Sequence, residues 1–334
     1  MARWLSDQGI ERLRGAPDEP DLGGTKYELE ALLSRGGMGA VYRVHDRELD
    51  RSVALKVIAL PDPGESDLAR MEREARILAR LEHPGIVPIH DVGRLADGRV
   101  FYVMKEIRGT RFDQRRDLPL EDGITVLERV AEAVAFAHAH GIVHRDLKPE
   151  NIMVGEYGEV LVLDWGVARW SGTAEEASTR LGTDDGAATS PPESHETLAG
   201  TILGTPGYMA PEQARGEART ATPAADVYGL GAILHFILAG HPPRGSEITL
   251  PRATSRPLRA ICQRALAADP AGRYASAREF GSDLARFRAR QPVSAHRESP
   301  LERLFRLIAK YRTPILIIVT YLIVRALILI WLRR

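Results

Sequence analysis

The stretch His144-Arg145-Asp146-Leu147-Lys148-Pro149-Glu150-Asn151 places a carboxylate, an ammonium group and an amide within six positions of one another. Transfer of a phosphoryl group needs little covalent help from a protein, but it needs positioning and charge compensation. In such a site Asp146 would orient the acceptor hydroxyl and take its proton, and Lys148 would offset charge on the moving phosphoryl group. Asn151 would hold a metal ion. These residue types at this spacing therefore predict a phosphoryl-transfer site.

A glycine-rich turn and a strand with a lysine precede this stretch. The turn contains Gly36 and Gly39, and glycines let backbone N–H groups approach phosphate oxygens closely. Lys56 ends the apolar run Val53-Ala54-Leu55, where an unpaired ammonium group would be costly to bury. Glu74, in the helix expected next, is its candidate partner. The alternatives are a hairpin turn without a ligand, a lysine that reaches solvent and a solvated glutamate.

Composition narrows the class of protein. The chain has 334 residues, enough for two domains or one large bilobal domain, and equal numbers of basic and acidic side chains, 45 of each. A neutral chain gives no reason to expect a nucleic-acid partner. Cys262 is the only cysteine, so no intrachain disulfide and no multi-cysteine metal site can form. We interpret Cys262 as a buried packing residue rather than a nucleophile.

The hydrophobic pattern changes along the chain from strands to helices. Strand patterns cover 27–33, 40–44, 53–58, 86–92 and 100–104, and a helical pattern covers 68–81. Further helices are predicted over 124–139, 226–238, 258–268 and 276–288, the second of them very apolar and buried. The segment 171–194 lacks periodicity and predicts a mobile loop, and 291–300 predicts a linker. Residues 1–24 lack the apolar core of a signal peptide.

From about residue 27 to residue 287 the chain resembles the eukaryotic-type protein kinase family, within it the bacterial serine/threonine branch. The resemblance rests on residues 144–151, on Val53-Ala54-Leu55-Lys56, on Asp164-Trp165-Gly166 and on Ala210-Pro211-Glu212. It implies an α+β bilobal fold with a small β-rich lobe and a larger helical lobe. It also implies ATP and Mg²⁺ or Mn²⁺ as cofactors, and transfer of the γ-phosphoryl group to Ser/Thr hydroxyls of protein substrates.

The resemblance assigns roles to further residues. Asp164 joins Asn151 as a metal ligand, Asp226 begins a buried helix, and Arg273 is the partner of Glu212. Met104 precedes the hinge, and the backbones of Lys105 and Ile107 would bind adenine. The walls of the adenine pocket would be Leu33, Val41, Ala54, Met153 and Leu163.

Three departures from the family pattern stand out. Ser34 replaces the first glycine of the phosphate loop, which predicts a stiffer loop, whereas Trp165 replaces a phenylalanine and keeps a large apolar ring. Only fourteen residues separate Pro243 from Leu258, where the family has a longer stretch with a helix used in docking. This puts conventional substrate docking in doubt but leaves the phosphate chemistry intact.

Regulation is expected at the activation segment, which by resemblance ends at Ala210-Pro211-Glu212. In family members that have an arginine before the catalytic aspartate, as Arg145 stands here, the arginine can pair with a phosphate on the activation segment. A phosphothreonine can order a loop in that way. We predict autophosphorylation at Thr197 first and Thr201 second, the alternative being unmodified hydroxyls. Thr205 is expected to bond to Asp146 and Lys148 and to shape the acceptor site.

The end of the chain is apolar. Ile315–Leu332 contains eighteen residues, about 27 Å as a helix, close to a ~30 Å hydrocarbon core. Arg325 costs about 3 kcal/mol, but the Leu, Ile and Val residues sum to about −6 kcal/mol, which favours insertion. More Lys and Arg precede the stretch than follow it, so we expect a single-pass helix in membrane lipid with a cytoplasmic kinase domain at the cell membrane. The alternative is an apolar helix for oligomerisation or packing, and no outer sensor domain is expected.

The expected organisation is then an N-terminal extension 1–26, a kinase domain 27–290 divided into lobes 27–107 and 108–290, a linker 291–313 and a transmembrane helix 314–332. Two alternatives remain for function. One is a membrane-tethered pseudokinase scaffold, disfavoured because Lys56, Glu74, Asp146, Asn151 and Asp164 are all present. The other is a small-molecule phosphotransferase, which usually lacks Leu147-Lys148-Pro149 and Ala210-Pro211-Glu212. Lys148 also favours Ser/Thr over tyrosine specificity.

Overall fold

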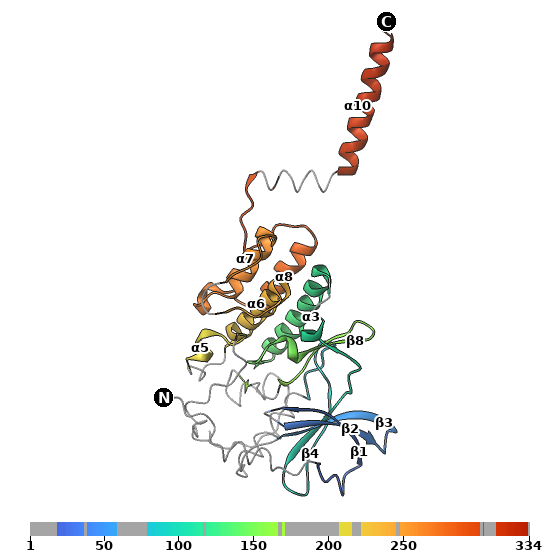
Figure 1. Cartoon of the computed structure of the whole chain (residues 1–334), viewed down its shortest axis with the longest axis vertical. Coiled ribbons are helices and arrows are strands. Elements are labelled where there is room, and N and C mark those ends of the chain that lie inside the picture. Colours follow the sequence, from blue (N-terminus) through green and yellow to red (C-terminus); the bar gives the residue numbers. More distant parts are fainter. Residues whose placement is uncertain are drawn as a thin grey trace, which may run out of the picture.

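The computed structural model shows two lobes, a β-sheet lobe from the first part of the chain and a helical lobe from the remainder (Figure 1). The predicted bilobal α+β architecture is confirmed. The structure describes residues 19–36, 39–58, 79–115, 118–165, 169–170, 207–215, 222–244, 248–300, 303 and 312–332. The predicted loop 171–194 and nearly all of the predicted helix 68–81 lie outside these residues.

The β lobe contains one antiparallel sheet with the strand order β1-β2-β3-β5-β4. Its strands are β1 (Tyr27–Gly36), β2 (Gly39–Asp46), β3 (Arg51–Ile58), β4 (Ile89–Arg94) and β5 (Val100–Met104). All five were predicted, but β4 begins at Ile89 rather than at residue 86, because Pro88 has no N–H to donate to a ladder. Five consecutive residues of β3 are buried, as expected for the central strand of a covered sheet.

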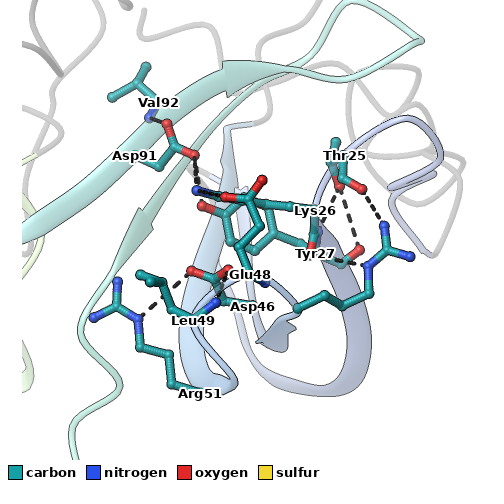
Figure 2. A network of polar contacts seen from close by, with 10 residues as sticks. Thr25, Lys26, Tyr27, Asp46, Glu48, Leu49, Arg51, Asp91 and Val92 are labelled. Atoms are coloured by element: carbon teal, nitrogen blue, oxygen red, sulfur yellow. Dashed lines mark hydrogen bonds and ion pairs between the residues drawn. The ribbon is translucent and has the colours of Figure 1, made fainter.

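A polar network anchors the start of the sheet (Figure 2). The Tyr27 hydroxyl donates to Asp91 Oδ2 on β4 at 2.7 Å, and Lys26 Nζ lies 3.3 Å from Glu48 Oε2 and 3.7 Å from Asp91 Oδ2. The buried Asp46 accepts the backbone N–H groups of the turn that follows β2. The start of β1, the β2–β3 turn and β4 are therefore tied together at one edge of the lobe.

The helical lobe packs four long helices around an apolar core. They are α3 (Leu120–Ala139), α6 (Pro223–Ala239), α7 (Arg256–Ala265) and α8 (Ala277–Arg288), and a short α5 covers Pro211–Ala214. The four long helices were predicted. Helix α3 begins four residues early, because Pro119 precedes it and acidic residues fill its first turn.

Helix α6 is the centre of this lobe, and the prediction that it is buried is confirmed. Val227, Leu230, Ile233 and other residues along it are fully buried, and Gly240 ends the helix with a left-handed φ of 78°. Cys262 packs behind it with its Sγ 3.7 Å from Gly231 O, and burial raises the pKa of this thiol to about 12. At neutral pH the thiol stays protonated, which agrees with a packing role.

Short strands in the helical lobe escaped prediction. A three-stranded sheet consists of β6 (Gly109–Arg111), β8 (Ile152–Gly155) and β9 (Val160–Val162), and β7 (Ile142–Val143) pairs with β10 (Arg169–Trp170). Two to four residues are too few to show an alternating pattern. These strands nevertheless matter, because β7 and β8 bracket the stretch 144–151.

The segment between α6 and α7 contains no helix in its described residues, 240–244 and 248–255. Buried His235 on α6 fixes it: Nδ1 lies 2.9 Å from His241 O, and Nε2 lies 3.2 Å from Thr249 O. This short connection is the one whose length departs from the family pattern.

The packed lobe extends beyond the predicted boundary at residue 290. Asp283 on α8 is fully buried and accepts hydrogen bonds from Ser294 N at 2.8 Å and Ala295 N at 3.0 Å. Val293 is also buried. The first part of the predicted linker is therefore held on α8.

Helix α10 (Arg312–Leu332) lies away from both lobes in Figure 1. The prediction that this stretch is helical is confirmed, but the prediction of a membrane span over 314–332 is not supported. Among the residues that the structure describes, no helix combines the length and the apolar character needed to cross a membrane. Location at the cell membrane stays a prediction.

Candidate active site

The stretch 144–151 forms a loop between β7 and β8, and Asp226 on α6 holds its beginning. Asp226 Oδ2 accepts from His144 N at 2.8 Å, and Asp226 Oδ1 accepts from Arg145 N at 2.7 Å. His138 Nε2 on α3 lies 2.7 Å from Asp226 Oδ2. Burial would raise the pKa of Asp226, but the hydrogen bond and charge of His138 and the backbone donors outweigh it and lower this pKa.

Asp146, Lys148 and Asn151 form one cluster. Lys148 Nζ lies 2.7 Å from Asp146 Oδ2, and Asn151 Nδ2 donates to Asp146 O at 2.8 Å and to Asp146 Oδ2 at 3.3 Å. The Asp146 side chain is 13% exposed, so it is partly shielded but reachable by a substrate. The structure thus brings together the three groups that the sequence predicted for phosphoryl transfer.

Asp164 lies beside this cluster and next to Asn151. Leu163 N donates to Asn151 O at 2.8 Å, which sets the two metal-ligand candidates on neighbouring backbone. Asp164 has a left-handed φ of 55°. Because Asn151 Nδ2 donates to Asp146, its amide oxygen is the atom that it can offer to a cation.

These two oxygen donors fit Mg²⁺ or Mn²⁺. Within the described residues no group of three or more His, Cys, Asp or Glu side chains could hold a metal. Mg²⁺ is typically bound through one or two protein oxygens together with substrate phosphates, rather than by an all-protein cage. The residues present therefore suit a metal that arrives with a nucleotide.

Lys56 connects the two lobes. Its ammonium group on β3 is buried and forms an ion pair with the Asp164 carboxylate. Burial tends to lower the pKa of Lys56, but Tyr102, its cross-strand neighbour on β5, and Asp164 raise it above its usual value. Burial also tends to raise the pKa of Asp164, but the charge and hydrogen bond of Lys56 outweigh this effect. The pKa of Asp164 is therefore lowered. Both groups are therefore charged at neutral pH.

The predicted adenine-binding residues lie where the sheet meets the hinge. Ala54 pairs with Met104 across β3 and β5, and Val41 pairs with Lys56 across β2 and β3. Lys105 N donates to Pro88 O at 3.2 Å, so its carbonyl oxygen is the backbone group it can offer to adenine. Gly36 pairs with Gly39 at the end of the β1–β2 ribbon, and Gly39 has a φ of 133°, which favours glycine.

The other predicted positions also lie on strands or shortly after them. Leu33 and Ser34 lie on β1, Met153 lies on β8, Leu163 follows β9, and Ile107 follows β5. Trp165 is buried, its ring centroid lies 4.7 Å from that of His144, and its Nε1 donates to Val162 O at 3.2 Å. The tryptophan thus packs an apolar ring against the catalytic loop, residues 144–151.

Glu212 and Arg273 form a bidentate pair at the start of α5. Arg273 NH1 and NH2 donate to the two carboxylate oxygens at 2.7 and 2.8 Å. Arg273 is buried and also donates to backbone carbonyl oxygens of residues 224, 267 and 268. Burial tends to raise the pKa of Glu212, but the hydrogen bond from Arg273 opposes this effect. The net result is a pKa below the usual value of a glutamate.

Several predicted residues lie outside the described part of the chain: Glu74, Thr197, Thr201, Thr205 and Gly166. The sequence missed three residues that contact the site. His138 reaches Asp226, Tyr102 faces Lys56, and Gln213 donates to Arg145 O at 3.0 Å. The one available sequence signal was the position of Gln213 directly after Ala210-Pro211-Glu212. No local pattern indicates that Gln213 contacts Arg145, or that His138 and Tyr102 reach the site.

The chain belongs to the protein kinase family, since residues 27–280 match the protein kinase domain. It is 37% identical over 289 residues to the serine/threonine-protein kinase pkn3 of Myxococcus xanthus, with 78% of this chain and 49% of the relative covered. It is 42% identical over 226 residues to the DNA damage-responsive serine/threonine-protein kinase RqkA of Deinococcus radiodurans, with 65% of this chain and 30% of RqkA covered. The resemblance to bacterial serine/threonine kinases is therefore confirmed, and this chain spans about half or less of these relatives.

Solved structures agree. The crystal structure of the PknI kinase domain of Mycobacterium tuberculosis matches with a TM-score of 0.57 and 27% sequence identity. The match covers 78% of this chain and 95% of the PknI kinase domain. Both lobes are therefore those of a protein kinase.

Proposed function

We propose that this chain transfers the γ-phosphoryl group of ATP to serine and threonine hydroxyls of proteins in signal transduction. The observation that carries the proposal is the joint geometry of the two lobes. Lys56 on the sheet pairs with Asp164, and Asp164 adjoins the Asp146, Lys148 and Asn151 cluster. The charged groups of Lys56, Asp164, Asp146 and Lys148 therefore face one place.

The residues divide the work as follows. Asp146 accepts the proton of the attacking hydroxyl and orients its oxygen, and Lys148 compensates charge on the transferred group. Lys56 positions the nucleotide phosphates. Mg²⁺, which Asn151 and Asp164 would hold, supplies charge neutralisation at the β- and γ-phosphates when bound.

The test uses purified chain, γ-labelled ATP, Mg²⁺ and an array of Ser/Thr peptides, beside Lys56→Met. We expect the parent chain to label Ser and Thr, and the variant to lose at least about a hundredfold in rate, as when one preorganised charge contact to the transition state is removed. Melting temperature checks that the variant is folded. A parent chain that binds nucleotide but transfers no phosphate would instead favour the pseudokinase scaffold.

We also propose that the activation segment is autophosphorylated, at Thr197 first and Thr201 second. A phosphothreonine brings nearly two negative charges and can pair with Arg145 beside the catalytic Asp146. The double variant Thr197→Ala/Thr201→Ala should lose about tenfold to a hundredfold in kcat, comparable with one hydrogen bond to a charged group, roughly 1.5–3 kcal/mol. Mass spectrometry of the parent chain locates the sites. Unchanged activity of the double variant contradicts the proposal.

A further inference from the structure

The amide of Gln213 links α5 to Arg145, which lies 68 positions earlier in the chain. Gln213 Oε1 accepts from Ala210 N at 3.0 Å, at the end of the activation segment. Gln213 Nε2 donates to Arg145 O at 3.0 Å, in the catalytic loop. Both polar ends of one half-buried side chain are thus engaged, one on each segment.

The Arg145 backbone needs such support. Arg145 has a φ of 73°, a left-handed conformation that a residue with a side chain rarely adopts. Such a conformation persists only where the surroundings hold it in place. Asp226 accepts the Arg145 N–H at 2.7 Å, and Gln213 satisfies the Arg145 carbonyl. The two contacts come from different parts of the helical lobe.

The Arg145 carbonyl belongs to the peptide group that leads directly into Asp146. A rotation of this peptide would move the Asp146 carboxylate relative to Lys148 and Asn151, with which it makes contacts of 2.7 and 3.3 Å. Gln213 itself sits on a fixed support, because the adjacent Glu212 is clamped by the buried Arg273. The orientation of Asp146 therefore depends on where α5 lies.

We infer that Gln213 is a positioning residue for phosphoryl transfer, which couples the end of the activation segment to the orientation of Asp146. The inference rests on the proposed kinase function and deepens it. Gln213 touches neither nucleotide nor acceptor in this role. Its loss should therefore lower kcat and leave the KM for ATP nearly unchanged.

The test compares Gln213→Glu with Gln213→Ala in the full chain. The glutamate keeps an acceptor for Ala210 N but cannot donate to Arg145 O at neutral pH. We expect kcat to fall about tenfold with glutamate and somewhat less with alanine, as for loss of one hydrogen bond that sets geometry. The KM for ATP should change less than about twofold. Gln263→Glu, the same change at an exposed position of α7, is the matched control and should behave as the parent chain.

The outcomes separate a positioning role of Gln213 from a purely structural one, and both from failure of the proposed kinase function. If the parent chain is active and Gln213→Glu keeps its kcat within about twofold, the inference fails while the proposed function stands. An equal loss of kcat and of ATP affinity, with a lowered melting temperature, would show a structural role only. If the glutamate variant does not fold, the alanine variant, which introduces no second acceptor beside the carbonyl, decides by the same two constants. An inactive parent chain would contradict the proposed function itself.

Discussion

Replacing Asp146 with asparagine is expected to lower kcat for phosphoryl transfer by roughly a thousandfold, within the 10²–10⁴ range of a lost general base. The asparagine side chain has the same shape but cannot take the proton of the attacking hydroxyl. It also removes the negative partner of Lys148, whose Nζ lies 2.7 Å from Asp146 Oδ2. The measurement is incorporation of labelled phosphate into a Ser/Thr peptide under saturating ATP.

The fold should survive this change, because the Asp146 side chain is partly exposed and its backbone contacts do not use the carboxylate. Nucleotide affinity should stay within about threefold of the parent value, since the charges of Lys56 and Asp164 are untouched. Asp122→Asn, at an exposed position of α3, is the matched control and should retain full activity. Activity of Asp146→Asn above a tenth of the parent rate would exclude the assigned role.

Replacing Asp226 with alanine is expected to lower the free energy of unfolding by about 3–5 kcal/mol and to abolish most activity. The change leaves the N–H groups of His144 and Arg145 without their acceptor in a buried place, and it removes the carboxylate beside His138. A domain is usually stable by only about 5–15 kcal/mol, so this is a large fraction of the total. Urea unfolding curves at neutral pH give the difference.

The acid dependence of stability supplies a second measurement for Asp226. The pKa of Asp226 is lowered in the folded protein, so the carboxylate adds stability above its unfolded pKa of about 3.9. That stability is lost as the pH falls from this value through the lower folded pKa. The alanine variant should therefore lose less stability than the parent below about pH 4. Glu132→Ala, an exposed carboxylate on α3, should change stability by less than about 0.5 kcal/mol, and a similar small effect at Asp226 would refute the prediction.

Elements with a strong local pattern were predictable. Helix α6 is mostly apolar and was expected to be buried, and β3 was recognised from its apolar residues before Lys56. The ends of these elements were harder to predict, because a signal such as Pro223 at the first position of α6, or Gly240 at its C-cap, acts at one position only. The short strands β7 and β8 carry no pattern of their own and form because the surrounding lobe brings their partners together.

The candidate site likewise has a local part that the sequence predicted and a long-range part that it did not. The types and spacing of Asp146, Lys148 and Asn151 predicted their chemistry, and these residues contact one another because only a few residues separate them. Glu74, the candidate partner of Lys56, lies outside the described residues and stays a prediction. The structure shows an ion pair of Lys56 with Asp164, which the sequence had not indicated. That pair joins residues 108 positions apart.

The amino-acid sequence by itself determined the class of chemistry, the family and the order of the five strands of the β lobe and the four long helices. These depend on residue types and on short-range periodicity, both of which are visible along the chain. Only the tertiary structure decided which groups hold the catalytic loop: Asp226, 82 positions from His144, and Gln213, 68 positions from Arg145. A hydrogen bond requires atoms about 3 Å apart, and such approach between distant segments is set by the packing of the whole lobe around α6 rather than by any local pattern.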